Sequence, residues 1–355
     1  MNHECHCQSL NRKLLLLPPE TDFDADAVDG IAAGLGWTAV DSLDAYEVPL
    51  GPGQQFEALG QLSDFLRGLY PQAHEHFRIA WLDPGRPLSR QFAALADARP
   101  LSEVAPRRDS LITAILGARA IETWFQPIFM LRDMMLWGYE CLMRARDTDG
   151  RLVNPGRIIE MAREENLTFV LDRVCRECHI ENATKAGVPP HCRLLINFLP
   201  TVIYQPEVCL RTTLAAVERC GISHDRIIFE VVESELVEDR DKLCRILDFY
   251  RREGFGVALD DMGAGYSGLN MMADLSPDLI KIDRELISRS VKSSMHRSVC
   301  RAIAELGRSE GKLVLAEGVE TKAELEIMRD LEVDLVQGFL FGRPQPEPVV
   351  TPLSF

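Results

Sequence analysis

Residues 255–269 read FGVALDDMGAGYSGL, an apolar run that ends in two aspartates and is followed by a glycine-containing segment. A short apolar run bounded by turn residues is typical of a buried β-strand, and glycine permits the sharp bend that leads into a helix. We therefore predict a strand, a loop that carries two carboxylates, and a helix. This order is the repeating unit of parallel α/β folds.

The same alternation recurs about eight times after Asp109. The apolar runs are Thr123–Phe129, Leu136–Arg144, Arg193–Phe198, Ile227–Val232, Phe255–Asp260, Leu279–Ile282, Lys312–Ala316 and Asp334–Gly338. About eight such units within about 240 residues predict a (β/α)8 TIM-like barrel. Only residues 130–135 separate the first two runs, which is too short for a crossover between parallel strands, so we predict an antiparallel first strand in a hairpin.

The first 105 residues are organised differently. Apolar runs at Lys13–Leu17 and Phe77–Leu82 alternate with helix-like stretches and Pro/Gly clusters, which indicates a small α/β domain. We expect a regulatory or sensory domain of unknown signal at 1–105, a barrel at 109–346 and a C-terminal tail at 347–355. A helix at Ser110–Ala120 would connect the two domains.

Composition and charge limit the function classes. The chain has 355 residues, of which 46% are hydrophobic and 26% charged, which is typical of a folded globular protein. The net charge of −15 argues against binding to duplex nucleic acid. Residues 1–60 carry −8 of this charge, either as a solvated face or as a docking surface for an unknown basic partner. The apolar run Leu14–Leu17 is too short for a signal peptide or a membrane span, so we expect no membrane insertion, a cytoplasmic protein and reduced cysteines.

Polar residues stand at or near the ends of six predicted barrel strands. They are Glu140, Asn197, Glu230, Asp260, Asp261, Lys281 and Glu317. The strand ends at one rim of a barrel converge, so these residues would form one acidic cluster. Five carboxylates at close range raise one another's pKa unless cations compensate, and an all-oxygen ligand set favours Mg²⁺ or Mn²⁺ over zinc. In the alternative interpretation, each acid separately caps a helix or forms an ion pair on the surface. This alternative accounts less well for polar residues that recur at the ends of six strands in register.

Several ordered motifs resemble the EAL-domain cyclic di-GMP phosphodiesterases. They are YECLMR at 139–144, NFLP at 197–200, DDMGAGYS at 260–267, KIDR at 281–284, AEGVET at 316–321 and QGFLF at 337–341. The resemblance covers about residues 109–346. It implies metal-dependent hydrolysis of one phosphodiester bond of cyclic di-GMP to linear pGpG, which regulates a bacterial second messenger.

The resemblance also implies a role for individual residues. One metal would be held by Glu140, Asn197, Glu230 and Asp260, and a second by Asp260, Asp261 and Glu317. The implied catalytic residues are Lys281, Glu317 and Glu140. The implied substrate-binding residues are Gln126, Arg144, Gln337 and Pro200, with Gln337 and Lys281 near the attacking water. Glu233 would steady the loop after Asp261, which the family uses at its dimer interface, so a homodimer through the barrel is implied.

Two divalent cations suit this reaction on chemical grounds. They lower the pKa of a bridging water and neutralise charge that develops on the phosphoryl oxygens. Ca²⁺ should inhibit, because its longer and looser coordination would misplace that water.

The sequence departs from the family pattern at a few positions. These are Cys141 in place of Ala, Met262 in place of Phe, and Ala264 and Gly268 in the following loop. Cys141 should face away from Glu140, because side chains alternate along a strand. The loop departures concern dimer coupling and rate more than metal binding. The sequence has no GGDEF-like motif.

Two cysteine and histidine groups have other interpretations. Residues 175–179, CRECH, match a haem-attachment pattern, but their helical character within the barrel argues against it. The group His3, Cys5, His6 and Cys7 has residue types that bind zinc, although an unliganded terminus is the simpler interpretation.

Three functional hypotheses follow. The first is a phosphodiesterase regulated by its N-terminal domain, the second is an EAL-type cyclic di-GMP receptor that does not cleave its ligand, and the third is a protein-interaction module. The retained acids favour the first.

Overall fold

The computed structural model describes residues 13–17, 38–40, 45–48, 77–82, 98–100, 110–165, 167–203, 210–232, 240–262 and 268–348. The chain divides into two compact units. One contains residues 1–114 and 161–167, and the other contains residues 115–160 and 168–355. None of the helices in these described ranges is long and apolar enough to cross a membrane.

The N-terminal unit contains an antiparallel sheet in the order β2-β3-β1-β4-β5. Its strands are β1 (Lys13–Leu17), β2 (Thr38–Val40), β3 (Ala45–Val48), β4 (Arg78–Leu82) and β5 (Arg99–Pro100). The strands predicted at the two apolar runs are confirmed as β1 and β4, which pair with each other. Leu15, Leu16 and Ile79 are buried there. The helices expected in this domain fall outside the described residues.

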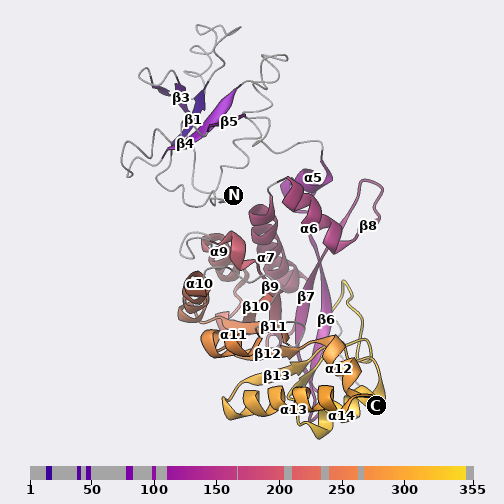
Figure 1. Ribbon diagram of the computed structural model, residues 1–355. Helices are drawn as coiled ribbons and strands as arrows, with labels where there is room; N and C mark the ends of the chain where they lie inside the picture. Colours follow the sequence, from indigo (N-terminus) through magenta and orange to yellow (C-terminus); the bar gives the residue numbers. More distant parts are fainter. Residues whose placement is uncertain are drawn as a thin grey trace. The chain divides into compact units, whose positions relative to one another are not determined.

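In the second unit, eight strands of the described chain close into a barrel, as predicted (Figure 1). They are β6 (Glu122–Met130), β7 (Leu136–Arg146), β9 (Arg193–Asn197), β10 (Ile227–Val232), β11 (Gly256–Met262), β12 (Leu279–Ile282), β13 (Leu313–Ala316) and β14 (Leu335–Val336). Neighbouring strands from β7 round to β14 are parallel. Strand β6 is antiparallel to both of its neighbours.

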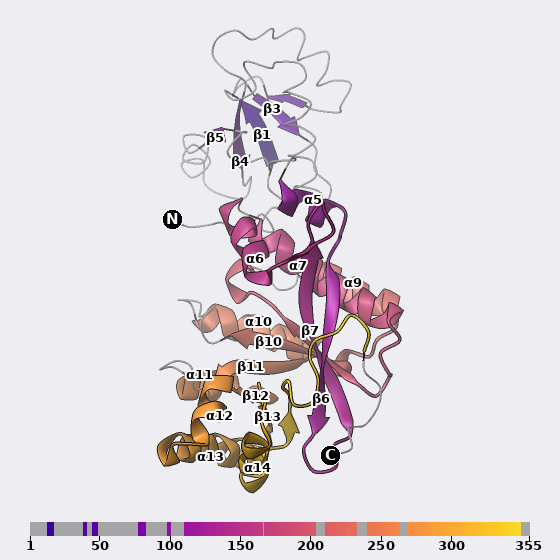
Figure 2. The same cartoon turned by 90° about the vertical axis from the view of Figure 1, so that its right-hand side faces the viewer.

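The β6–β7 hairpin confirms the prediction made from the short connection. Its two long strands lie side by side in Figure 2, and Gln126 stands opposite Glu140. The turn between them has Met134 at a φ of 54° and a hydrogen bond from the amide of Met130 to the carbonyl of Met135, 2.9 Å long. The short strand β8 (Leu152–Val153) pairs with the end of β7.

A helix precedes β6 in the chain, and at least one helix lies in each connection between successive parallel strands. These helices are α5 (Leu111–Gly117), α6 (Pro155–Glu164), α7 (Thr168–Lys185), α9 (Arg211–Cys220), α10 (Arg240–Arg252), α11 (Gly268–Leu275), α12 (Arg284–Ser290), α13 (Ser294–Ser309) and α14 (Lys322–Asp330). Short 3-10 helices occupy Pro200–Val202 and His224–Arg226. The helix predicted at Ser110–Ala120 is shorter than expected, because the hydrogen bond from the amide of Ala120 to the carbonyl of Ile115 closes it before the chain enters β6.

One buried side chain from each barrel strand contributes to an apolar layer near the amino ends of the parallel strands. The layer consists of Ile128, Trp137, Leu195, Ile228, Ala258, Leu279, Leu315 and Leu335. Removing these side chains from water stabilises the closed barrel.

Candidate functional site

Most of the predicted site residues lie at or near the carboxyl ends of the parallel strands. Glu140 lies on β7, Asn197 ends β9, Glu230 lies on β10, Asp260 and Asp261 on β11 and Lys281 on β12, while Glu317 directly follows β13 and Gln337 directly follows β14. One carboxylate oxygen from each of Glu230, Asp260 and Glu317 lies within 4.8 Å of the other two. The convergence expected from strand order is therefore present.

Lys281 lies at the centre of this cluster. Its ammonium Nζ is 2.5 Å from Glu230 Oε1, 2.6 Å from Glu317 Oε1 and 3.0 Å from Asp260 Oδ2. The side chain is 1% exposed. Burial alone would lower the pKa of Lys281, but the surrounding carboxylates outweigh burial and hold that pKa well above its ordinary value. Lys281 is therefore a fixed positive charge.

One ammonium does not balance the carboxylates. Burial, together with the neighbouring acids, raises the pKa of both Glu230 and Glu317 well above the ordinary value despite Lys281. Gln337 Oε1 is buried and accepts no hydrogen bond from the residues that the structure describes. A cluster of acidic oxygens with excess negative charge and an unsatisfied carbonyl oxygen beside it fits a hard divalent cation.

A β-bulge places two consecutive aspartates opposite one residue of the neighbouring strand. Leu259 pairs with Ile280 and Met262 with Ile282, so Asp260 and Asp261 together stand opposite the single residue Lys281. Side chains normally alternate between the faces of a strand, and the extra residue of a bulge breaks that alternation. Asp261 adopts a left-handed φ of 59°. Burial and the adjacent Asp260 raise the pKa of Asp261 to about 6.

Hydrogen bonds hold the polar residues around the cluster. Asn197 Nδ2 donates to Glu230 Oε2 at 3.1 Å, and Gln337 Nε2 donates to Glu140 Oε2 at 2.7 Å. The residue after Gln337 is Gly338, where a Cβ atom would lie 2.1 Å from the carbonyl oxygen of Val319. Glycine at this position therefore permits the close approach that places Gln337.

Apart from Gln337, the residues expected to bind substrate lie near the site without joining the cluster. Gln126 faces Glu140 across the hairpin and donates to the carbonyl of Gly342 at 3.4 Å. The Arg144 guanidinium stacks on Trp124 at 5.3 Å and donates to the carbonyl of Met143 at 2.7 Å. Pro200 is buried at the start of the 3-10 helix after β9.

Several other predicted features have a definite place. Cys141 is buried next to Glu140, and burial raises the pKa of its thiol well above the ordinary value. Met262 is buried and Gly268 begins α11. Glu233, Ala264, the rest of the loop 263–267 and the group His3, Cys5, His6 and Cys7 lie outside the described residues.

The C-x-x-C-H segment belongs to the protein core. Cys175, Cys178 and His179 are buried on α7, and His179 Nδ1 lies 2.7 Å from the Thr123 hydroxyl. Burial lowers the pKa of His179 to about 4. The cysteines in the described part of the chain are free thiols.

A second polar group near the site was missed by sequence analysis. Asp172 and Arg176, four residues apart on α7, form a fully buried ion pair. Their spacing on one face of a helix is the signal that could have revealed the pair.

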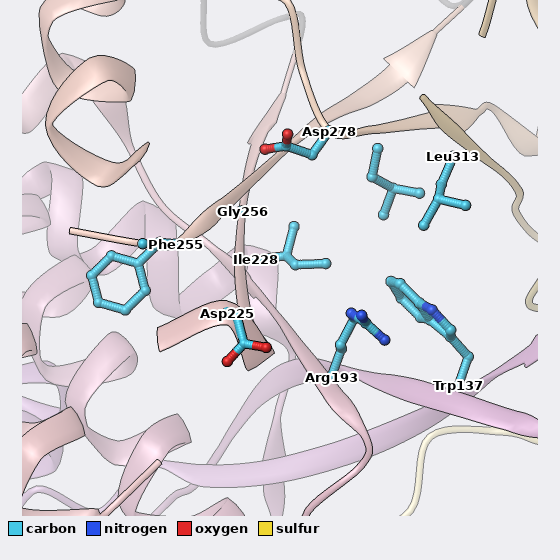
Figure 3. A pocket seen from close by; sticks show the side chains of 10 residues that line it. Trp137, Arg193, Asp225, Ile228, Phe255, Gly256, Asp278 and Leu313 are labelled. Atoms are coloured by element: carbon cyan, nitrogen blue, oxygen red, sulfur yellow. The ribbon is translucent and has the colours of Figure 1, made fainter. Parts of the chain in front are cut away.

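A separate cavity of about 320 Å³ lies at the opposite end of the barrel strands (Figure 3). It is lined by residues at or near strand starts, including Trp137, Arg193, Ile228 and Leu313. The Arg193 guanidinium lies 5.1 Å from the centre of the Trp137 ring. Among the predicted site residues that the structure describes, none lines this cavity, so it is distinct from the carboxylate cluster.

Comparison with known proteins agrees with this geometry. A family model described as "EAL domain" matches residues 108–344. The chain belongs to the EAL domain family. The family inferred from the sequence motifs is thus confirmed.

Relatives of this EAL domain include named cyclic di-GMP phosphodiesterases. The bifunctional diguanylate cyclase/cyclic di-GMP phosphodiesterase MucR of Pseudomonas aeruginosa is 30% identical over 65% of this chain and 34% of MucR. The cyclic di-GMP phosphodiesterase NbdA of the same organism is 30% identical over 64% of this chain and 29% of NbdA. The chain thus spans about a third of the length of these curated relatives.

A solved structure shares the fold. The c-di-GMP-bound crystal structure of a standalone EAL protein from Vibrio cholerae O395 is 36% identical, with a TM-score of 0.58, and the match covers 65% of this chain and 96% of that chain. The similarity therefore concerns the EAL domain.

Proposed function

We propose that this chain is a phosphodiesterase that hydrolyses one ester bond of cyclic di-GMP to give linear pGpG. The observation that carries the proposal is the buried cluster of Glu230, Asp260 and Glu317 around Lys281 at the carboxyl ends of the barrel strands. Its support is the presence of this cluster in an EAL domain whose relatives include named cyclic di-GMP phosphodiesterases.

The proposal includes two bound divalent cations, Mg²⁺ or Mn²⁺. Their ligands would be Glu140, Asn197, Glu230 and Asp260 for one ion and Asp260, Asp261 and Glu317 for the other. When bound, the cations would supply an activated water at neutral pH and charge neutralisation at the phosphoryl oxygens.

The remaining residues would orient the reactants. Lys281 Nζ, held as a cation among three carboxylates, would stabilise the deprotonated water and the anionic phosphoryl group. Gln337 would present its free Oε1 to that water, because its Nε2 is already engaged by Glu140. Arg144 and Gln126, together with Pro200, would contact the substrate beside the cluster.

The proposed assembly has further parts. We infer a homodimer through the barrel, with Glu233 steadying the loop after Asp261. Residues 1–105 would form a regulatory or sensory domain that responds to an unknown signal or partner, residues 109–346 the phosphodiesterase barrel, and residues 347–355 a tail.

The test is turnover by the purified full chain. Cyclic di-GMP should be converted to pGpG in Mg²⁺ or Mn²⁺ and not in excess chelator, and Glu140→Ala or Asp260→Ala should abolish conversion because each removes an oxygen ligand. Glu305→Ala, at an exposed position on α13, is the matched control and should match the parent. Full activity in chelator would refute the proposal. Metal-dependent binding of intact cyclic di-GMP without cleavage would indicate a receptor instead.

A further inference from the structure

The backbone that follows Asn197 is fixed by two hydrogen bonds to groups outside its own loop. The amide of Phe198 donates to the carbonyl of Glu230 at 3.3 Å, and the amide of Leu199 donates to the side chain of Asp172 at 2.9 Å. The Phe198 ring packs against Phe229 and Tyr250, with centroid distances of 6.1 and 5.1 Å. These contacts hold the backbone directly after Asn197, whose Nδ2 donates to Glu230 Oε2 at 3.1 Å.

Asp172 divides its two carboxylate oxygens between different partners. Oδ2 accepts from Arg176 Nε at 3.1 Å and from Arg176 Nη2 at 2.6 Å. Oδ1 accepts from the Leu199 amide. The ion pair therefore leaves one oxygen of Asp172 for the loop that follows Asn197.

Arg176 is itself held in place. Its Nη1 donates to the Thr213 hydroxyl on α9 at 2.5 Å, and the Arg176 side chain is completely buried. Burial alone would lower the pKa of Arg176, but Asp172 outweighs burial and keeps the guanidinium charged. Residues of α7 and α9 thus hold the buried Asp172–Arg176 pair, and this pair provides the acceptor for the Leu199 amide beside the site.

We propose that Asp172, oriented by Arg176, is a positioning residue that sets the Asn197 side chain for metal binding by anchoring the Leu199 amide. The inference rests on the proposed function of Asn197 as a metal ligand. Partners that orient the ligands of a metal are worth about 10- to 100-fold in affinity or activity when they are removed. A buried ion pair that only stabilises the core would have no such effect on metal binding.

A matched pair of double variants separates these two roles. Replacing both members of a buried ion pair avoids leaving an uncompensated charge, so both variants should fold. Asp172→Asn with Arg176→Met keeps an oxygen acceptor for the Leu199 amide. Asp172→Leu with Arg176→Met keeps the branched shape and the number of heavy atoms of the side chain at position 172 but has no acceptor.

Hydrogen exchange of the full chain tests the anchor directly. The Leu199 amide should exchange about 10- to 150-fold more slowly in the parent protein than in the Leu-containing variant, which lacks the charged acceptor. The Asn-containing variant should retain most of this protection and the Leu-containing variant should lose it. Rapid exchange of Leu199 in the parent would overturn the inference without any variant.

Mn²⁺ binding, measured by titration without substrate, provides the second measurement. The Leu-containing variant should bind Mn²⁺ about 10- to 100-fold more weakly than the parent, and the Asn-containing variant within about three-fold of it. Turnover at saturating Mn²⁺ should recover toward the parent value in the Leu-containing variant. Equal Mn²⁺ affinity in both variants, or equal exchange at Leu199, would overturn the positioning role. A parent protein that neither binds Mn²⁺ nor cleaves cyclic di-GMP would refute the proposed function and, with it, the part of the inference that concerns metal binding. Hydrogen exchange at Leu199 would still decide whether Asp172 anchors the loop.

Discussion

Replacing Lys281 with methionine should destabilise the metal-free protein in a strongly pH-dependent way. Lys281 is the ammonium partner of Glu230, Asp260 and Glu317 at 2.5–3.0 Å, and it is 1% exposed. Removing one partner of a buried ion pair typically costs about 3–5 kcal/mol, because the other charge stays buried without compensation. We expect a loss of that size in the free energy of unfolding of Lys281→Met at pH 8 in chelator.

The loss should decrease as the pH falls. Glu230 and Glu317 already have a raised pKa, and removal of the ammonium raises it further. A carboxyl group whose pKa is higher in the folded state contributes stability at low pH and loses it as the pH rises through that folded pKa. Near pH 5 the two acids can hold protons, so the variant should recover at least about half of its loss relative to the parent.

Urea unfolding of the full chain, monitored at pH 5 and pH 8 in chelator, measures this difference. Lys292→Met, at an exposed position after α12, is the control and should change stability by less than about 0.5 kcal/mol. Added Mn²⁺ should restore part of the stability of Lys281→Met, because a bound cation favours the folded state. A Lys281→Met protein as stable as the parent at pH 8, or one with an equal loss at both pH values, would refute the charge-compensation argument.

Four further outcomes are expected. Cys141→Ala should keep turnover within about three-fold of the parent, because the thiol behaves as a small buried hydrophobe; a loss like that of Glu140→Ala would show a direct role. When the pH falls from 8 to 5, the free energy of unfolding of the parent should decrease by about 2 kcal/mol more than that of His179→Gln. The reason is that His179 takes up a proton near pH 6.5 in the unfolded state, whereas buried His179 in the folded state, with a pKa of about 4, does not. Equal pH dependence of the two proteins in urea unfolding would contradict this. Ca²⁺ added to the Mg²⁺-loaded enzyme should inhibit turnover, and stimulation would count against the site. A chain that begins at Arg107 should still fold, bind metal and cleave cyclic di-GMP, with its turnover rate or dimer affinity changed by about 5- to 150-fold. If its turnover and its sedimentation both match those of the full chain, a docking role for the acidic residues 1–60 becomes the better hypothesis.

The order of barrel strands and the identity of the acidic residues could be read from the sequence. Runs such as Ile227–Val232 and Leu279–Ile282 have the bounds predicted for them, because fully buried parallel strands are continuous apolar segments. The hairpin followed from the short connection at 130–135. Strands β2, β3 and β5 were missed, since elements of two to four residues carry too little pattern to distinguish them from loops.

The sequence by itself determined which acids end the strands, because strand order and barrel closure bring the carboxyl ends to one rim. Only the tertiary structure decided which of these acids contact Lys281 and how their negative charge is balanced. The bulge at Asp260 and Asp261 breaks the strand alternation on which sequence prediction depends, and it places both residues opposite Lys281. The anchoring of the Leu199 amide by Asp172 likewise joins residues 27 positions apart. The contact between Asp172 and Leu199 depends on how α7 packs against the barrel, and no local pattern in the sequence predicts that packing.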